Sequence, residues 1–514
     1  MITENPFRLI VWSIGTVVCA ILWRCIFGRN HLKPLPPGPA GWPLIGNLLD
    51  MPTTEPQWTV FKRWGETWGN IMSISLLGQR MVILNSYKDA VALFEKRSAN
   101  YSDRPILIVA GQEIGWDEAG VLCRYGDALR EQRRAYTHLL GTRKALEQFT
   151  PIIEDQARQL LIGLLEHPQH LQRQLKRVVA ALTLEITHGY HVKEDNDLVV
   201  QTVNQVMEDF SEAFLPGRFA VDLLPSLQYI PAWFPGTGWK TLVAQYKRNI
   251  TLFHELSYRY VKKEMAAGTA TPSFLGSILE PEMSLEKENT WKWAAAALFA
   301  AGSDTTVSAM ATFFLAMVLF PEVQQRAQRE IDTVIGTGQL PLASDRERLP
   351  YVNALCLEVM RWQPVLPLGA PRRNMEDDIY NGYFFPKGTT FIANAWNMLH
   401  DPEIYANPFA FNPERYLLLE RKEPELDPRQ IAFGFSRRIC PGLQLADWNM
   451  FVQCAMSLAV FDVSKAIENG QIIEPRVEYT TLGSVSHPLP FKYSLKPRNA
   501  KAEALIRQVK LEYE

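Results

Sequence analysis

The chain has 514 residues, of which 47% are hydrophobic and 21% charged, and its formal net charge is −2. This composition is typical of a globular protein, and the near-neutral charge gives no reason to expect a nucleic-acid partner. The six cysteines form no C-x-x-C pair, which argues against a disulfide framework or a zinc site and for a reducing compartment. No repeat, low-complexity run or long Gly/Ser linker divides the later chain, so we expect one large α-rich domain over residues 51–514.

Residues 7–27 are expected to form a transmembrane anchor. Between Phe7 and Phe27 the only charged residues are Arg8 and Arg24, near the two ends. A helix of this length, at about 1.5 Å per residue, covers roughly the 30 Å of a bilayer core. The basic residues after the run place the body of the protein in the cytoplasm by the positive-inside rule. A cleaved signal peptide is the alternative, but no small-x-small cleavage site follows.

Residues 28–50 are expected to form a proline-rich hinge. Five prolines lie between Pro34 and Pro43. Because proline fixes φ and favours extended chain, the run predicts a stiff spacer between the membrane and the domain. Taken alone, it is also typical of a ligand for a proline-binding module.

Residues 291–320 form a long apolar stretch without proline, which predicts a helix buried on most of its surface. Inside it lies Ala301-Gly302-Ser303-Asp304-Thr305-Thr306. Glycine in a helix interior costs about 1 kcal/mol relative to alanine, and buried acid or hydroxyl groups need hydrogen-bond partners. Taken alone, the hexapeptide is typical of a kinked helix with an exposed polar notch.

Charged residues recur in two later apolar segments. Glu358 and Arg361 are three residues apart, so a helix places both on one face. Arg415 follows in the sequence Phe411-Asn412-Pro413-Glu414-Arg415-Tyr416. Taken alone, the first pair is typical of a surface ion pair, worth about 0–1 kcal/mol.

The most informative segment is Phe433-Gly434-Phe435-Ser436-Arg437-Arg438-Ile439-Cys440-Pro441-Gly442, which precedes an apolar, helix-like run. A cysteine at a helix N-terminus lies where free N–H groups and the helix dipole favour an anion, here a thiolate. Thiolate is one of the few axial ligands that proteins use for haem iron, and it favours cleavage of the O–O bond. The alternative is that Cys440 is a small buried hydrophobic residue, as most free cysteines are.

In this order, the segments resemble the signature motifs of the cytochrome P450 family. The Cys440 segment is similar to F-x-x-G-x-R-x-C-x-G, with Ser436 in place of a usual glycine. Residues 301–306 match [AG]-G-x-[DE]-T-[TS], and the later charged segments match E-x-x-R and P-E-R-F with Tyr416 as the aromatic residue. The resemblance extends from the hinge to Pro488 and implies the P450 fold, an α-rich haem-binding domain with a small β-rich lobe. Residues 221–236 look like fungal secondary-metabolism members.

The resemblance implies haem b as cofactor and a role for each motif residue. Cys440 would ligate the iron, with Phe433 in the same loop. Gly302 would leave room for the distal oxygen ligand, Thr305 would donate a hydrogen bond in the oxygen groove, and Asp304 would pass protons in from solvent. Three residues would form a buried charged triad under the loop: Glu358, Arg361 and Arg415.

Arginines suit the two haem propionates because their geometry is bidentate. Arg438 is the first candidate. Arg133 matches the second arginine of the family's W-R-x-x-R motif, in which Leu129 replaces tryptophan, so that one propionate donor is missing. Arg372 falls where relatives carry Arg or His for the same task. Each of these arginines could instead be a solvated surface charge.

The resemblance implies a monooxygenase that inserts one atom of O₂ into a C–H bond of a small hydrophobic substrate, for which we expect a terpenoid or another fungal secondary metabolite. The sequence contains no G-x-G-x-x-G or Walker-type loop, so electrons are expected from a separate NADPH–cytochrome P450 reductase. The endoplasmic reticulum membrane is the expected location. Four segments are expected to line the pocket: residues 104–122, 209–219, 365–370 and 483–487.

Two other interpretations remain open. One is a haem-thiolate isomerase or dehydratase that needs no reductase, against which the intact Asp304-Thr305 pair argues. The other is a non-catalytic haem protein, such as a sensor or carrier, which needs no proton relay.

Overall fold

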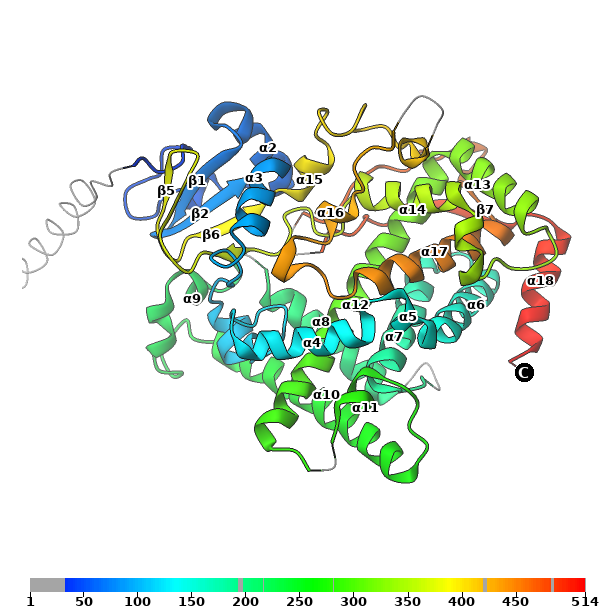
Figure 1. Cartoon of the computed structure of the whole chain (residues 1–514), viewed down its shortest axis with the longest axis horizontal. Coiled ribbons are helices and arrows are strands. Elements are labelled where there is room, and N and C mark those ends of the chain that lie inside the picture. Colours follow the sequence, from blue (N-terminus) through cyan, green and yellow to red (C-terminus); the bar gives the residue numbers. More distant parts are fainter. Residues whose placement is uncertain are drawn as a thin grey trace, which may run out of the picture.

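The computed structural model describes residues 33–192, 197–215, 217–280, 282–418, 423–481 and 485–513. The predicted transmembrane anchor, residues 7–27, and the beginning of the hinge lie outside these ranges, so both stay predictions. The described chain is mainly α, as predicted, with several small sheets. Figure 1 shows the helices gathered around one central helix, with the largest sheet at the end where the described chain begins.

The central helix is α12, Leu285–Leu319, which contains the predicted apolar stretch. Its N-terminus is capped by Ser284, whose hydroxyl accepts a hydrogen bond from the Lys287 N–H, and it ends just before Pro321. Among the described residues it is the one helix long and apolar enough to cross a membrane, but most of its apolar stretch is buried inside the protein. It is therefore a core helix.

The described chain has ten other long helices: α2 (Gln57–Trp68), α4 (Asp127–Leu140), α6 (Thr150–Glu166), α7 (Leu171–His188), α8 (Leu198–Ala213), α10 (Trp239–Ala267), α13 (Pro321–Val334), α14 (Pro350–Trp362), α17 (Leu443–Val460) and α18 (Ala500–Leu511). The shorter α-helices are α3 (Tyr87–Val91), α5 (Arg143–Leu146), α9 (Ala220–Leu223), α11 (Phe274–Ile278), α15 (Ala395–Leu399) and α16 (Arg429–Ala432). Single turns of 3₁₀ or π-helix join several of them, among them η3 (Ile108–Glu113), η4 (Trp116–Glu118), η8 (Pro413–Tyr416) and η9 (Ser436–Arg438).

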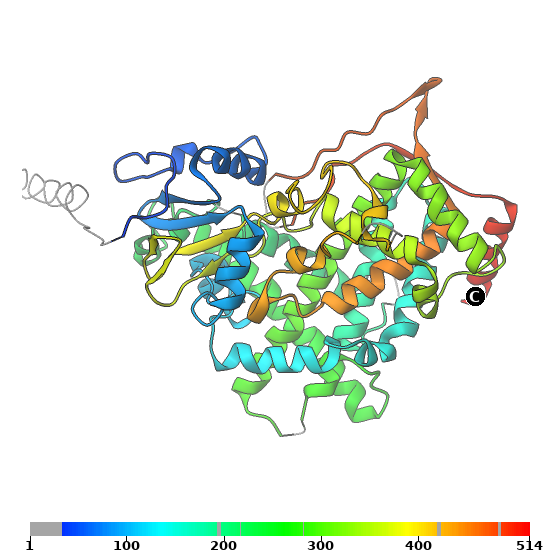
Figure 2. The same cartoon turned by 45° about the horizontal axis from the view of Figure 1, so that its top comes forward.

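The largest sheet has four strands in the order β1-β2-β6-β3, with bounds Ile71–Leu76, Gln79–Leu84, Thr390–Ala393 and Arg372–Arg373. Strands β2 and β6 are parallel, and the other neighbours are antiparallel (Figure 2, blue beside yellow). The β1–β2 hairpin turns at Leu77 and Gly78, both with positive φ, as a tight two-residue turn requires. Three two-stranded sheets complete the β structure: β4 (Asp378–Tyr380) with β5 (Tyr383–Phe385), β7 (Phe461–Lys465) with β10 (Tyr493–Pro497), and β8 (Ile467–Glu468) with β9 (Gln471–Ile472).

The described part of the proline-rich hinge lies against the first sheet. The Ser73 N–H donates to the Pro37 carbonyl at 2.8 Å and its hydroxyl to the Pro36 carbonyl at 2.7 Å, while the Phe384 N–H donates to the Pro34 carbonyl at 2.8 Å. Proline lacks an N–H but its carbonyl still accepts. The end of the hinge is therefore docked on the domain, which a simple spacer would not be.

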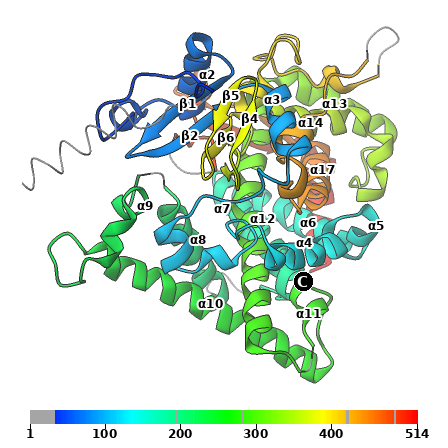
Figure 3. The ribbon, with the colours of Figure 1, turned by 60° about the vertical axis from the view of Figure 1, so that its left-hand side comes forward.

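Two apolar clusters hold the helices together. The larger joins α6, α7, α13, α14 and α17 to the second half of α12. The smaller joins η3, η4, α8 and α10 to the first half of α12. Figure 3 shows α8, α9 and α10 on one side of α12, away from α14 and α17. The Cys440 loop comes directly before α17, so the packing of α17 fixes its position.

Candidate active site around the Cys440 loop

The Cys440 loop closes on itself. The Cys440 N–H donates to the Phe433 carbonyl at 2.8 Å, and Gly434 has a φ of 76°, which glycine adopts without strain. Ser436, where the family pattern has glycine, also has a positive φ, 45°. For a residue with a side chain this conformation costs about 1–2 kcal/mol, so the loop holds Ser436 in a strained position.

The Cys440 thiol lies two residues before the N-cap of α17, Gly442, instead of within the first turn of that helix. Burial raises the pKa of the thiol, while the Gly442 N–H and the nearby Arg133 act in the opposite direction. The helix N-terminus alone therefore does not outweigh burial. Binding to a metal would supply the remaining drive, because coordination removes the thiol proton.

The polar motif of α12 lies on a part of the helix that other protein groups do not fully cover. Ala301 is exposed, although residues on both sides of the motif are buried. The Thr305 hydroxyl donates to the Ala301 carbonyl at 2.6 Å, one turn earlier in the helix. This bond uses the hydroxyl proton and leaves the hydroxyl oxygen free to accept a hydrogen bond from another donor. Asp304 is paired with His487, with 3.0 Å between Oδ1 and Nε2.

Gly302 has a packing role that the sequence did not predict. A Cβ at this position would lie 2.8 Å from Cγ2 of Thr183 in α7, which is too close for an undisturbed contact. The glycine lets α7 and α12 approach each other. The expectation that it leaves room for the distal oxygen ligand is a separate prediction.

Glu358, Arg361 and Arg415 lie together, fully buried, as the resemblance implied. Arg361 holds Glu358 through two bonds of 2.8 Å each, and Arg415 Nε lies 3.1 Å from the same carboxylate. The remaining guanidinium hydrogens go to backbone carbonyls, including that of Pro408 at 2.6 Å. Because η8 carries Arg415 onto α14, the cluster ties these elements together.

A fourth member of this cluster, Glu425, was not predicted. Its carboxylate lies 2.5 Å from Nη1 of Arg415. Two carboxylates therefore face two guanidinium groups, and the formal charges cancel. We call these four residues, Glu358, Arg361, Arg415 and Glu425, the balanced cluster. No motif identified Glu425, because it follows Arg415 through a loop of no regular spacing.

A second group of arginines lies near the Cys440 loop. Arg438 is buried and donates to the carbonyls of Ser102, Gly120 and Cys123 at 2.7, 3.1 and 2.6 Å. Each acceptor is a backbone carbonyl, which is polar but neutral. The charge of Arg438 is therefore held in place without being neutralised.

The other two predicted arginines bond to the Cys440 loop itself. Arg133 in α4 is half-buried and donates to the Ile439 carbonyl at 2.9 Å. Arg372 in β3 is buried and donates to the Phe435 carbonyl at 2.6 Å. Two elements far apart in the sequence thus hold the two sides of the loop.

Arg104 joins this group, although it was predicted only as the first residue of a pocket segment. It is buried and donates to the carbonyls of Val121, Ala370 and Pro371 at 2.9, 2.7 and 2.6 Å. We call Arg104, Arg133, Arg372 and Arg438 the unbalanced cluster, because within the described chain none of the four has an ion-pair partner. Leu129, which replaces the family's tryptophan, is buried nearby in α4 and offers no donor.

The unbalanced cluster fits the cofactor that the resemblance implies. Burial and the neighbouring cations lower the pKa of Arg372 to about 9, and burial lowers the pKa of Arg438 to about 10. The pKa of Arg104 is also lowered, by burial and then by the three other arginines. Buried cations that repel one another need an anion, and the two propionates of haem are anions that arginine binds well.

Two of the predicted pocket segments, 104–122 and 209–219, meet on the first half of α12. The Trp116 ring lies 4.6 Å from the Phe210 ring and 5.4 Å from the Trp293 ring, measured between centroids. Of the other two, residues 365–370 contact the last one, since the Ser486 N–H donates to the Val365 carbonyl at 2.9 Å. Residues 482–484 lie outside the described chain.

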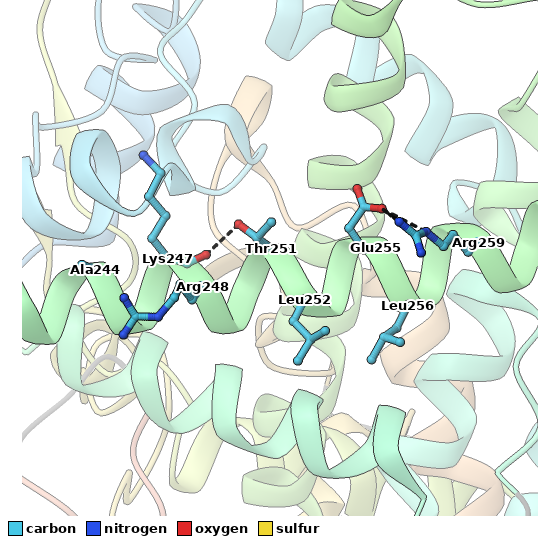
Figure 4. Close-up of a pocket in the computed structure, with 8 residues that line it drawn as sticks. All are labelled: Ala244, Lys247, Arg248, Thr251, Leu252, Glu255, Leu256 and Arg259. Atoms are coloured by element: carbon cyan, nitrogen blue, oxygen red, sulfur yellow. Dashed lines mark hydrogen bonds and ion pairs between the residues drawn. The ribbon is translucent and has the colours of Figure 1, made fainter.

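Two grooves open elsewhere on the surface. One, of about 790 Å³, is lined by eight residues of α10 alone; Leu252 and Leu256 point to one side, and Thr251 and Glu255 to the other (Figure 4). None of the predicted site residues lines it. The other, of about 1740 Å³, lies between α6, α7, α8 and α12, and Asp304 borders it.

Comparison with known proteins identifies the family. The model of the family described as Cytochrome P450 matches residues 36–495. The chain is 48% identical over 501 residues to cytochrome P450 monooxygenase 208 of Postia placenta, covering 97% of this chain and 98% of that protein. It is 44% identical to cytochrome P450 monooxygenase claR of Ampulloclitocybe clavipes, covering 99% and 94%, and 36% identical to cytochrome P450 monooxygenase ppsD of Aspergillus oryzae, covering 97% and 95%. The chain therefore belongs to the cytochrome P450 family of haem-thiolate monooxygenases.

Proposed function

We propose that this P450 monooxygenase hydroxylates a small hydrophobic substrate of the terpenoid class at the site between the Cys440 loop and α12. The reaction is R–H + O₂ + 2 e⁻ + 2 H⁺ → R–OH + H₂O. Haem with a thiolate ligand supplies cleavage of the O–O bond. The observation that carries the proposal is the unbalanced cluster beside a cysteine loop: the residues hold four cations and a thiol where a dianionic metal cofactor would bind.

In this proposal Cys440 would bind the haem iron and the unbalanced cluster would hold the propionates. Arg438, Arg133 and Arg372 were proposed from their motifs, and Arg104 is added because its burial and its carbonyl partners are of the same kind. Phe433 fixes the position of the cysteine through the bond from the Cys440 N–H to its carbonyl. The balanced cluster keeps the polypeptide around the loop rigid.

Thr305 and Asp304 deliver the protons that the reaction consumes. The Thr305 hydroxyl can accept a hydrogen bond while it is bonded to Ala301, and can donate one when that bond opens. Asp304 borders a groove that is open to solvent, so its carboxylate can exchange protons with water. Gly302 belongs to the same stretch of α12, where we propose that oxygen binds.

The apolar cluster on the first half of α12 supports a hydrophobic substrate. Trp116, Phe210 and Trp293 come from three separate elements, and the Trp116 ring contacts the other two there. Side chains of this kind bind apolar ligands through buried area and shape. A substrate rich in C–H bonds and poor in charge suits them.

We propose that the protein is anchored in the endoplasmic reticulum membrane and receives electrons from NADPH–cytochrome P450 reductase. Trp233 and Tyr229, in the segment after α9, are each 81% exposed. Figure 1 places α9 at the end of the molecule where the described chain begins, and Trp42 and Leu44 of the hinge are exposed as well. Exposed aromatic residues beside a predicted anchor suit the polar–apolar boundary of a bilayer.

The proposal is tested by expressing the chain with the reductase and profiling metabolites. We expect an oxygenated terpenoid that requires both NADPH and the reductase. Thr305→Ala should consume NADPH but release more hydrogen peroxide per product, whereas Thr305→Ser, which keeps the hydroxyl, should stay coupled. Product formation without NADPH would favour a haem-thiolate isomerase, and equal coupling in wild type and Thr305→Ala would contradict the role of Thr305.

A further inference from the structure

One face of α12 carries three polar side chains at intervals of four residues: Asp304, Ser308 and Thr312. Each contacts the segment near the C-terminus that contains Tyr479, Ser486 and His487. The Asp304 carboxylate lies 3.0 Å from His487 Nε2, the Ser308 hydroxyl donates to the Ser486 carbonyl at 2.5 Å, and the hydroxyls of Thr312 and Tyr479 are 3.2 Å apart. These three contacts dock the segment along the helix that carries the oxygen motif.

The backbone of this segment is fixed on two further sides. The Thr480 N–H donates to the His487 carbonyl at 2.8 Å, and the His487 N–H donates to the Thr480 hydroxyl at 3.0 Å. The Ser486 N–H donates to the Val365 carbonyl at 2.9 Å. These hydrogen bonds hold the backbone at Ser486 and His487, from which the imidazole of His487 reaches Asp304.

The three contacts differ in their access to water. Ser308 and Thr312 are buried, whereas the side chains of Asp304 and His487 are 31% and 23% exposed. Asp304 also borders the groove between α6, α7, α8 and α12. A hydroxyl bonded to a carbonyl in the interior only fastens the segment, but an imidazole bonded to a carboxylate at the solvent boundary can also move a proton.

We propose that His487 is a positioning residue of the oxygenation reaction, which orients the Asp304 carboxylate and restores its proton. This inference rests on the proposed function of Asp304 and Thr305. It assigns a role in catalysis to a residue from the C-terminal part of the chain, about 180 positions from the motif that it serves.

The proton step balances within the pair. The imidazolium breaks its Nε2–H bond, and the proton forms an O–H bond at Oδ1 of Asp304, leaving neutral imidazole and a neutral acid. His487 then takes a proton from a hydronium ion of the solvent, which becomes water, and Asp304 passes its proton towards Thr305. No electron moves, and the only co-reactant is the solvent proton.

Other ionisable groups face the groove beside Asp304 and could affect its pH dependence. His191 Nδ1 lies 3.1 Å from Oε1 of Glu185 in α7, and the beginning of α7 adds basic side chains. The other groups are Glu154, Asp155 and Arg158 of α6 and Glu208 of α8. The test therefore needs a control histidine, and His191 serves, because it lines the same groove and is paired with a different acid.

The test measures hydrogen peroxide released per product as a function of pH, in the full-length enzyme with reductase. In wild type, uncoupling should increase as pH rises, because a neutral imidazole can no longer supply the proton to Asp304. His487→Gln keeps a hydrogen bond to Asp304 but cannot donate a proton, so its uncoupling should be intermediate and independent of pH. His487→Leu should release about ten times more hydrogen peroxide per product than wild type at every pH.

Two matched controls separate proton transfer from docking. Ser308→Ala removes an anchor of the same segment, and His191→Gln removes the other histidine of the groove; both should keep the wild-type pH profile. The proposal is overturned if Ser308→Ala also loses the pH dependence, because docking would then explain the effect. It is equally overturned if both His487 variants keep the wild-type profile.

A spectroscopic measurement tests the pair without turnover. In protein labelled with ¹⁵N-histidine, the ring nitrogen shifts report which nitrogen carries the proton, and the His487 signals are identified by their loss in His487→Gln. In wild type at high pH the proton should be on Nε2, facing Asp304, and Asp304→Ala should give a mixture of both tautomers. Unchanged nitrogen shifts in Asp304→Ala would overturn the pairing of His487 with Asp304. If the shifts confirm the pairing but Thr305→Ala stays fully coupled, the proposed function of Thr305 has failed, and the catalytic role of His487 fails with it.

Discussion

The balanced and unbalanced clusters both contain buried arginines, yet their chemistry differs. In the balanced cluster, Arg361 and Arg415 share Glu358, and Glu425 completes the neutralisation. In the unbalanced cluster, the four arginines donate to backbone carbonyls and repel one another. Burying a charge without a partner costs several kcal/mol. The first cluster is therefore neutral as folded, whereas the second has no anion paired with it in the described part of the chain, as we expect of a site for the haem propionates.

This difference distinguishes structure from function among residues of one type. Removing a member of the balanced cluster should damage the fold, because a buried charge loses its partner. Removing a member of the unbalanced cluster should weaken the cofactor site and damage the fold less, because weaker repulsion between the remaining cations offsets the lost hydrogen bonds to carbonyls. The following variants test this contrast in order of decreasing effect.

The largest effect is expected for Glu358→Gln, which leaves two buried guanidinium groups with one carboxylate. We expect a loss of about 3–5 kcal/mol in the free energy of unfolding and a low yield of folded protein. Thermal or denaturant unfolding measures it. Glu414→Gln is the control, because Glu414 pairs with Arg326 at the surface, where an ion pair is worth less than about 1 kcal/mol. Equal losses in both variants would contradict the assignment.

Arg372→Met should act mainly on cofactor retention. If Arg372 binds a propionate as proposed, its loss removes one charge-assisted bond worth about 1.5–3 kcal/mol, and haem transfer to apomyoglobin should become about 10- to 100-fold faster. The unfolding free energy of the haem-free protein should fall little or rise. Arg437→Met, an exposed neighbour of the same loop, should leave both quantities near wild type. A large loss of apoprotein stability with unchanged haem retention would place Arg372 in a structural cluster instead.

Lowering the pH should reduce the free energy of unfolding through His400, which lies near Arg361 of the balanced cluster. Burial lowers the pKa of His400 to about 3, and nearby Arg361 contributes to the same shift. Between this value and the ordinary histidine pKa near 6.5, the unfolded chain binds one more proton than the folded one, so stability falls as pH falls. His400→Phe has no such proton to bind, so below pH 6.5 the slope of its unfolding free energy against pH should be smaller than that of wild type by about 1.4 kcal/mol per pH unit. Identical slopes for wild type and variant between pH 6 and 4.5 would show that His400 is not held neutral.

The smallest effect is expected for Ser436→Gly, in the loop that both Arg372 and Arg133 contact. Glycine removes the strain of the positive φ but adds freedom to the unfolded chain, so the net gain should be about 0.5–1 kcal/mol in unfolding free energy. Ser464→Gly in strand β7, where extended backbone favours no glycine, should instead lose stability. Destabilisation by Ser436→Gly would mean that the serine side chain contributes more than its strain costs.

The sequence predicted the groups whose spacing is local. Glu358 and Arg361 are one helical turn apart, and Arg438 and Cys440 share a loop, so short motifs were sufficient to identify them. Glu425, Arg104 and His487 were missed as members of their clusters, because each meets its partners only through tertiary packing. The docking of the hinge on the first sheet was missed for the same reason, since the motif describes the stiffness of the prolines but not what their carbonyls contact.

The reduced carbon monoxide spectrum tests the central claim most directly, because it reports the atom opposite the bound gas. Wild-type protein should give the red-shifted band of a thiolate ligand, and Cys440→Ser should lose that band, while Cys123→Ser, a matched change at another buried cysteine, should keep it. A Cys440→Ser variant that still shows the thiolate band would contradict the account.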